Sequence, residues 1–194
     1  MSQSTFNPLI PLGDVPPYTP EEALTRQTFL ALMWSLSYPG RAYTLPTGGT
    51  AAFHAIVDTL VDLETSYYTS AADLSDYLSR SGARAFPPDH AEYHFYPTLT
   101  TDLLEIIKTA STGSLLYPDQ SATLFIGCRF GQGETYTLSG PGIPPNTTQT
   151  LTIDGIPAAF WTLRQSVARY PRGWDIYLID DDQVVGLPRT TSIL

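Results

Sequence analysis

The stretch ATLFIGC, residues 122–128, is almost continuously apolar. A short run without alternation of apolar and polar residues is typical of a strand that is covered on both faces. We therefore expect residues 122–128 to form a central strand of the fold. The next stretch, ETYTLSG at 134–140, alternates in polarity and is predicted to pair with this strand.

A helix is predicted upstream, where Thr19 precedes Pro20, Glu21 and Glu22. Thr19 suits the N-cap, Pro20 suits the first helical position, and Glu22 completes a capping box. The apolar pattern that follows stops at Pro39-Gly40, where we expect the helix to end.

The remaining pattern alternates between helices and strands and then places several strands near the end of the chain. Helices are predicted from about Thr50, from Ser70 to Gly82, over 101–110 and over 157–170; strands are predicted over 41–45, 66–69 and 91–96, and 174–180 with 183–188 as a closing hairpin. This order predicts an α/β or α+β sandwich with a mixed sheet. We expect one domain over residues 19–194, preceded by an extended proline-rich arm over residues 1–18.

Composition excludes several classes of protein. The formal net charge is −9 and the isoelectric point is about 4.5, which argues against a nucleic-acid binder and against an anionic membrane surface as partner. No apolar run approaches the roughly 20 residues that span a bilayer, and the first residues do not resemble a secretory signal. The single cysteine fits a reducing compartment, so we expect a cytoplasmic protein.

No catalytic residue, cofactor site or metal site is predicted from single residues. Cys128 lies in the most apolar run and is expected to be a buried structural thiol. Lys108 is the only lysine, so a Schiff base with pyridoxal phosphate would need it, but its helical pattern predicts a head group in water. His90 and His94 are four apart in a segment that does not look helical, and even with nearby Asp89 and Glu92 their spacing is not a closed ligand set. Asp180 to Asp182 are expected to form a solvated hairpin turn.

Two stretches are better candidates for binding. LSGPGIPP at 138–145 places Ser139, Gly140 and Gly142 directly after a strand, where backbone N–H groups could point at an anion; an ordinary tight turn explains the stretch equally well. The segment from Pro188 to Thr191 offers the guanidinium of Arg189 and the hydroxyls of Thr190 and Thr191, which suit a planar oxyanion. The alternative is that Arg189 pairs with one of the chain's many carboxylates.

Six segments together resemble a known family. They are TFLALMWSLSYPGR (28–41), LVDLETSYY (60–68), STGSLLYPDQSATLFI (111–126), LSGPGI (138–143), YPRGWDIYLID (170–180) and GLPRTT (186–191). Their order and spacing resemble PhnH, a subunit of the bacterial carbon–phosphorus lyase core complex. Arg41, at the end of the first segment, joins the candidate anion-binding or interface residues.

The resemblance implies a three-layer α/β sandwich with a mixed sheet, akin to the large domain of pyridoxal-phosphate-dependent transferases but without the cofactor. It implies a cytoplasmic homodimer that joins subunits of the PhnG, PhnI and PhnJ types. That assembly replaces the adenine of ATP by a phosphonate to give ribose 1-phosphonate 5-triphosphate. A radical iron–sulfur subunit acts later, and a chain with one cysteine cannot hold that cluster itself.

Three hypotheses follow. The first is a non-catalytic or site-sharing subunit in phosphonate utilisation, the second a stand-alone enzyme or binding protein for a phosphorylated small molecule, and the third a dimeric scaffold with a vestigial cleft. A homodimer is also expected because the chain carries 23 aromatic residues (3 Trp, 12 Tyr and 8 Phe), several in the exposed-looking segments 66–69 and 92–96.

Overall fold

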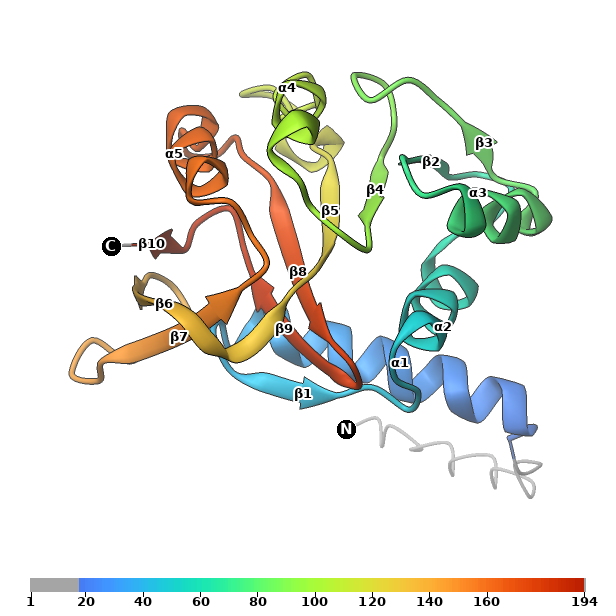
Figure 1. The fold of residues 1–194 in the computed structure, drawn as a ribbon, viewed down its shortest axis with the longest axis horizontal. Coiled ribbons are helices and arrows are strands. Elements are labelled where there is room, and N and C mark those ends of the chain that lie inside the picture. Colours follow the sequence, from blue (N-terminus) through green and yellow to red (C-terminus); the bar gives the residue numbers. More distant parts are fainter. Residues whose placement is uncertain (1–17, 194) are drawn as a thin grey trace, which may run out of the picture.

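The computed structural model describes residues 18–193, and Figure 1 shows the arrangement of their helices and strands. Apart from Tyr18, the predicted arm over residues 1–18 lies outside the described residues. None of the helices in the described part is long and apolar enough to cross a membrane.

A seven-stranded mixed sheet forms the middle of the molecule. Its strands, in spatial order, are β1 (Ala42–Thr44), β9 (Gln183–Leu187), β8 (Asp175–Asp180), β5 (Thr123–Gly127), β4 (Tyr93–Tyr96), β2 (Ser66–Thr69) and β3 (Arg84–Ala85). Strand β9 runs antiparallel to both of its neighbours, and all other pairs are parallel. The predicted closing hairpin is therefore confirmed as β8 and β9.

Strand β5 is central and buried on both faces, as the sequence predicts. Leu124 and Ile126 pack into one hydrophobic cluster, whereas Phe125 packs into the cluster on the opposite face, and all three side chains are inaccessible to solvent. The ring of Phe125 stacks on Phe95 at 4.8 Å and on Tyr177 at 5.0 Å between ring centroids. The stacked rings lie on β4, β5 and β8, and their packing favours this register of the three strands.

Helices cover both faces of this sheet. One face carries α1 (Pro20–Ser37), α2 (Thr50–Leu60) and α3 (Ala72–Leu78), which is followed by the 3-10 turn η1 (Ser79–Ser81). The other face carries α4 (Leu104–Ile107) and α5 (Ala158–Val167) together with a second sheet. Two short 3-10 turns, η2 (Thr101–Leu103) and η3 (Pro118–Gln120), complete the described elements.

The capping box predicted for the first helix is present. The backbone N–H of Thr19 donates to Glu22 Oε2 at 2.8 Å, and the N–H of Glu22 donates to Thr19 Oγ1 at 3.2 Å. The helix ends at Ser37, just before Pro39-Gly40. The sequence therefore sets both ends of α1 through local chemistry.

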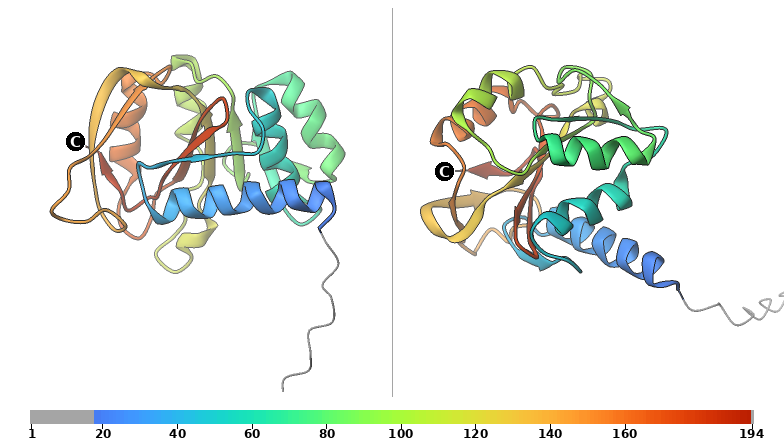
Figure 2. Two further views of the ribbon diagram at one scale, coloured as in Figure 1. Left: turned by 90° about the horizontal axis from the view of Figure 1, so that it is seen from below. Right: turned by 45° about the vertical axis from the view of Figure 1, so that its right-hand side comes forward.

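The predicted pairing of residues 134–140 with residues 122–128 is wrong. Both edges of β5 are occupied by β4 and β8, so the chain leaves the sheet at Cys128. Residues 134–140 belong to β6 (Arg129–Ser139), which forms a second sheet in the order β10-β6-β7 with β7 (Gln149–Asp154) and β10 (Ser192–Ile193). In every view of Figures 1 and 2, β6 and β7 lie on the opposite side of the molecule from α2 and α3.

Several predicted boundaries also change. The helix expected over 101–110 is reduced to η2 and one turn of α4, and the helix expected over 157–170 ends at Val167. The N-cap of α3 is Ala71 instead of Ser70. The segments 66–69 and 92–96 are largely interior, with Tyr67, Phe95 and Tyr96 buried, so they do not offer the exposed aromatic surface from which a homodimer was inferred.

Candidate functional site

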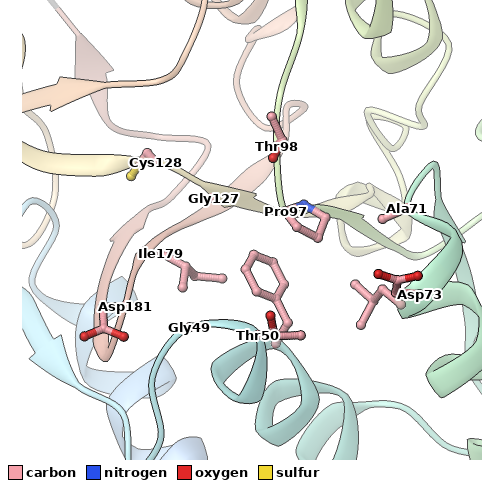
Figure 3. Close-up of a pocket in the computed structure, with 12 residues that line it drawn as sticks. Gly49, Thr50, Ala71, Asp73, Pro97, Thr98, Gly127, Cys128, Ile179 and Asp181 are labelled. Atoms are coloured by element: carbon pink, nitrogen blue, oxygen red, sulfur yellow. The ribbon is translucent and has the colours of Figure 1, made fainter.

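A pocket lies at the carboxyl edge of the parallel strands. In an open α/β sheet, ligands commonly bind in the crevice outside this edge. Here β2, β4, β5 and β8 end beside a cavity of about 380 Å³, which Figure 3 shows in close-up. Its lining is formed by Gly49, Thr50, Phe53, Ala71, Asp73, Leu74, Pro97, Thr98, Gly127, Cys128, Ile179 and Asp181.

The electrostatics of this pocket do not suit an anion. Its lining contains two carboxylates, Asp73 and Asp181, which lie on opposite sides in Figure 3, and no lysine, arginine or histidine. Asp181 also lies against the backbone that leads into α2, because a Cβ atom on Gly48 would stand 2.3 Å from its Oδ1. The N-terminus of α2, which attracts negative charge, therefore already faces a carboxylate of the same chain.

Cys128 at the rim of this pocket is not a poised nucleophile. Burial, assisted by the nearby carboxylate of Asp180, raises the pKa of its thiol to about 12. The thiol therefore stays protonated at neutral pH. The side chain is half-buried, so the prediction of a structural thiol holds but its burial is less complete than expected.

A second pocket, of about 500 Å³, lies beside the C-terminal segment. Its lining is formed by Pro141, Arg164, Gln165, Ala168, Tyr170, Arg189, Thr190, Thr191, Ser192 and Ile193. Two arginines and several hydroxyl-bearing residues thus line one space, and the lining contains no carboxylate. Of the two pockets, this one has the chemistry that suits an oxyanion.

Arg189 is fixed by an internal carboxylate. Its Nη2 lies 2.5 Å from Asp175 Oδ2, its Nε donates to Asp175 Oδ1 at 3.3 Å, and its backbone N–H donates to the same Oδ1 at 2.8 Å. Its Nη1 donates to the carbonyl of Pro118. Most of the N–H groups of this guanidinium are therefore bound within the chain. Of the two roles that the sequence leaves open for Arg189, the structure shows the pairing with a carboxylate of the same chain.

Arg164 is a functional candidate that the sequence analysis missed. It lies in the last turn of α5 with only 2% of its surface exposed, and it donates from Nη1 to the carbonyl of Thr191 and from Nη2 to the carbonyl of Pro188, both at 2.9 Å. Burial lowers the pKa of this guanidinium to about 10, and Asp175 opposes the shift, so the group stays charged at neutral pH. Its Nε and the Oγ1 of Thr191 are buried without a hydrogen-bond partner in the described residues.

The structure brings most of the predicted binding residues together. Ser139 of β6 pairs with Ser192, and a Cβ atom on Gly140 would stand 2.9 Å from the carbonyl oxygen of Thr190. Gly140 has a φ of +141°, so both its conformation and this close approach favour glycine. The LSGPGI turn therefore packs directly on Thr190 and Thr191.

Two predicted residues lie at the end of α1. Gly142 packs against the end of α1, where its Cβ atom would stand 2.6 Å from the carbonyl oxygen of Ser37. Arg41 follows that helix end and is exposed, with its guanidinium carbon 5.2 Å from the centre of the Tyr38 ring. Neither residue lines the C-terminal pocket.

The two histidines that could have formed a metal pair are separated by burial. His90 is exposed and lies 3.5 Å from Asp89, whereas His94 is fully buried in β4. The ring nitrogens of His94 lie 3.1 Å from the Tyr96 hydroxyl and 3.2 Å from the carbonyl of Ala91. Across residues 18–193, no group of three or more His, Cys, Asp or Glu side chains could hold a metal ion.

The fold places the chain among α/β proteins. Its C-terminal pocket brings arginines and hydroxyl-bearing residues together beside the last strand. A family model described as bacterial phosphonate metabolism protein (PhnH) matches residues 18–194, which is nearly the whole chain. The chain belongs to this family. It is also similar to the putative C-P lyase subunit protein HtxG of Stutzerimonas stutzeri, with 38% identity over 176 residues that cover 89% of this chain and 87% of that protein.

Proposed function

We propose that this chain is a subunit of a carbon–phosphorus lyase complex in organophosphonate catabolism. The similarity to a protein named as a putative C-P lyase subunit, over most of both chains, carries this proposal. Within the complex, the chain supports the formation of ribose 1-phosphonate 5-triphosphate from ATP and a phosphonate. It acts as a non-catalytic or site-sharing subunit, in keeping with the protonated thiol of Cys128 and the water-exposed amine of Lys108.

The proposed assembly is cytoplasmic and contains a homodimer of this chain with subunits of the PhnG, PhnI and PhnJ types. The fold is proposed to be akin to the large domain of pyridoxal-phosphate-dependent transferases without the cofactor, and the seven-stranded mixed sheet with helices on both faces supports this likeness. The chain's only lysine lies at the end of α4 and does not line the pocket at the carboxyl edge of the sheet.

The C-terminal pocket is the part of the chain that we propose to contact an anion or a partner subunit. Thr190 and Thr191 line this pocket, and Ser139 and Gly140 pack against the same segment without lining it. Arg164 holds the backbone of the segment in place. Arg189 is oriented by Asp175, so it contributes a rigid edge to the pocket. Gly142 and Arg41 would extend the same surface toward the end of α1.

A second candidate function is a stand-alone binding protein, or enzyme, for a phosphorylated or phosphonate small molecule. One observation favours it: the C-terminal pocket has a volume of about 500 Å³ and is lined by two arginines and no acidic residue. A pocket of this size accommodates a small ligand without any partner chain.

Co-expression separates the two functions. The tagged chain is expressed with subunits of the PhnG, PhnI and PhnJ types, and the purified material is analysed by size-exclusion chromatography and mass spectrometry. We expect a stoichiometric complex. In parallel, titration calorimetry of the isolated chain with methylphosphonate tests the alternative. Binding of the phosphonate without complex formation would replace the first function by the second.

A further inference from the structure

We propose that the loops over 111–120 and 169–173 form one docking face for a segment of another protein subunit that carries carboxylates beside apolar side chains. The docking face consists of Leu115, Leu116, Tyr117, Arg169, Tyr170 and Arg172. This inference rests on the proposed function, because it identifies the surface through which the chain would join a complex.

The apolar part of the docking face is unusually exposed. Leu115 and Leu116 are 72% and 83% exposed, Tyr117 is 57% exposed, and Tyr170 is 86% exposed. The N–H of Ser114 donates to the carbonyl of Tyr117 at 3.1 Å, so the two leucines are the central residues of a tight turn. Adjacent large apolar side chains that project into solvent in this way mark an interaction surface.

The two loops are tied to each other by main-chain contacts. Gly173 N–H donates to the carbonyl of Thr112 at 3.0 Å, and Thr112 forms a bridge with Ser121 that closes the first loop. Arg189 links them again, because its Nη1 donates to the carbonyl of Pro118 while its Cβ stands 3.1 Å from the position that a Cβ of Gly173 would occupy. A surface held in this way loses little conformational entropy on binding.

The charge of the docking face opposes that of the whole chain. Four of the ten basic residues lie in or beside it, namely Arg164, Arg169, Arg172 and Arg189, although the net charge is −9. Within residues 18–193, Arg189 pairs with Asp175, whereas neither Arg169 nor Arg172 makes an ion pair. Asp119 is the exposed carboxylate on the first loop, and Asp89 and Glu92 line a pocket with it. The positive charge of the docking face is therefore that of Arg169 and Arg172.

Arg169 and Arg172 also have a defined placement. Their backbones form a reciprocal pair of hydrogen bonds, with N–H···O distances of 3.1 and 2.8 Å, so that Tyr170 and Pro171 form the turn between them. Two arginines next to an exposed aromatic residue suit a segment that presents carboxylates beside an apolar side chain.

The same charge pattern argues against a second copy of this chain as the occupant. In a twofold dimer that used this face, each docking face would meet itself, and arginines would oppose arginines. Nucleic acid is disfavoured because the chain as a whole is strongly acidic. Another subunit with an acidic, apolar segment meets both requirements.

Two double variants test the proposal in the co-expressed complex. Leu115→Ser with Leu116→Ser removes the apolar turn, and Arg169→Glu with Arg172→Glu reverses the charge. Leu63→Ser and Arg80→Glu are the matched controls. Both residues lie near β3, an edge strand of the large sheet, and Leu63 is 74% exposed. Affinity for the remaining core subunits is measured by biolayer interferometry at two salt concentrations, and thermal unfolding verifies that each variant is folded.

We expect each docking-face variant to weaken binding at least tenfold and the two controls to change it less than twofold. Wild-type binding should weaken as salt is raised, and the charge reversal should abolish this dependence. Tight binding by both folded docking-face variants would overturn the docking face but leave the proposed function intact. If the wild-type chain fails to bind the core subunits, both the proposed function and the docking face are overturned. A fall from dimer to monomer in the variants, seen by light scattering, would show that the occupant is a second copy.

Discussion

The guanidinium of Arg189 lies against the carboxylate of Asp175, with 2.5 Å between Nη2 and Oδ2, and so ties the C-terminal segment to the start of β8. Both side chains are mostly buried, with exposed fractions of 17% and 21%. Asp175 also accepts the backbone N–H of Arg189 at 2.8 Å. One carboxylate therefore fixes both the main chain and the side chain of the segment from Pro188 to Thr191.

The first prediction concerns the strength of this pair. Arg189→Ala should lower the free energy of unfolding by about 1.5–3 kcal/mol, because it removes charge-assisted hydrogen bonds and leaves a mostly buried carboxylate. Arg189→Lys should not restore the loss, since an ammonium cannot reproduce the planar fork. Urea unfolding of both variants, of Asp175→Ala and of Arg189→Ala/Asp175→Ala would complete a double-mutant cycle. Additive effects in that cycle would show that the pair contributes nothing of its own.

The second prediction concerns Arg164. Arg164→Met keeps the length of the side chain but removes its hydrogen bonds to the carbonyls of Pro188 and Thr191. The carbonyl of Pro188 keeps the N–H of Thr191 as a donor at 2.9 Å, whereas the carbonyl of Thr191 loses the arginine. We expect a loss of about 3 kcal/mol in the free energy of unfolding, since two hydrogen bonds from a charged group are removed from a buried site. Amide hydrogen exchange should quicken selectively in β10.

Gln165→Ala is the matched control for this variant. It removes the neighbouring side-chain hydrogen bond to the carbonyl of Ile193, which is 3.0 Å long, but Gln165 is exposed. Its effect should stay below about 1 kcal/mol. Equal losses for Arg164→Met and Gln165→Ala would contradict a special role for Arg164.

Local signals made part of the fold predictable from the sequence. The capping box at Thr19 and Glu22 and the apolar run around Phe125 depend on a few neighbouring residues, and both predictions are confirmed. The pairing partner of β6 was mispredicted, because a half-covered strand shows the same alternation in either sheet. Strand β6 cannot pair with β5 because β4 and β8 already occupy both edges of β5. No local sequence pattern reveals this.

The candidate site was predictable only in part. Glycine and proline in LSGPGI and the PRTT segment drew attention to two stretches that the fold does bring into contact. Arg164 gave no such signal, because an arginine near the end of a helix normally extends its head group into water. The pocket at the carboxyl edge was missed as well; its one sequence signal is the pair Gly48-Gly49 before α2, which allows the approach of Asp181.

The third prediction is that the chain does not bind pyridoxal phosphate covalently. Lys108 lies at the surface, with 60% of its side chain exposed, and stands 3.6 Å from Glu105. An exposed amine of this kind is not activated for Schiff-base formation by burial. The chain is incubated with the cofactor, reduced with borohydride and analysed by mass spectrometry. Stoichiometric labelling of Lys108 would disprove the prediction.

The fourth prediction is a homodimer with a mass of about 43 kDa by light scattering, twice the 21.3 kDa of one chain. The aromatic residues first expected at its interface are buried within the chain, but α1 exposes Phe29 and Trp34 by 50% and 43%. Exposed aromatic residues on one helix are typical of an interface. Phe29→Ser with Trp34→Ser should shift the mass toward that of a monomer, whereas Leu63→Ser should not. A monomeric wild-type chain at micromolar concentration would contradict the prediction.

The last prediction is a pH dependence of stability that arises from His94. Burial lowers the pKa of this imidazole to about 4 from its usual 6.5, and its hydrogen bond to the carbonyl of Ala91 opposes the shift without reversing it. Between these two values the unfolded chain binds a proton that the folded chain does not. Stability from this group is therefore fully present above pH 6.5 and is lost progressively as the pH falls toward 4.

The expected size follows from the two pKa values of His94. Lowering the pH from 7 to 5 should reduce the free energy of unfolding by about 2 kcal/mol through this residue alone. Carboxylates add their own dependence, so the measurement is the difference between wild type and His94→Gln in urea unfolding at both pH values. His90→Gln serves as the control, because His90 is exposed. If His94→Gln shows the same fall in stability as wild type, the buried imidazole is not the group that titrates.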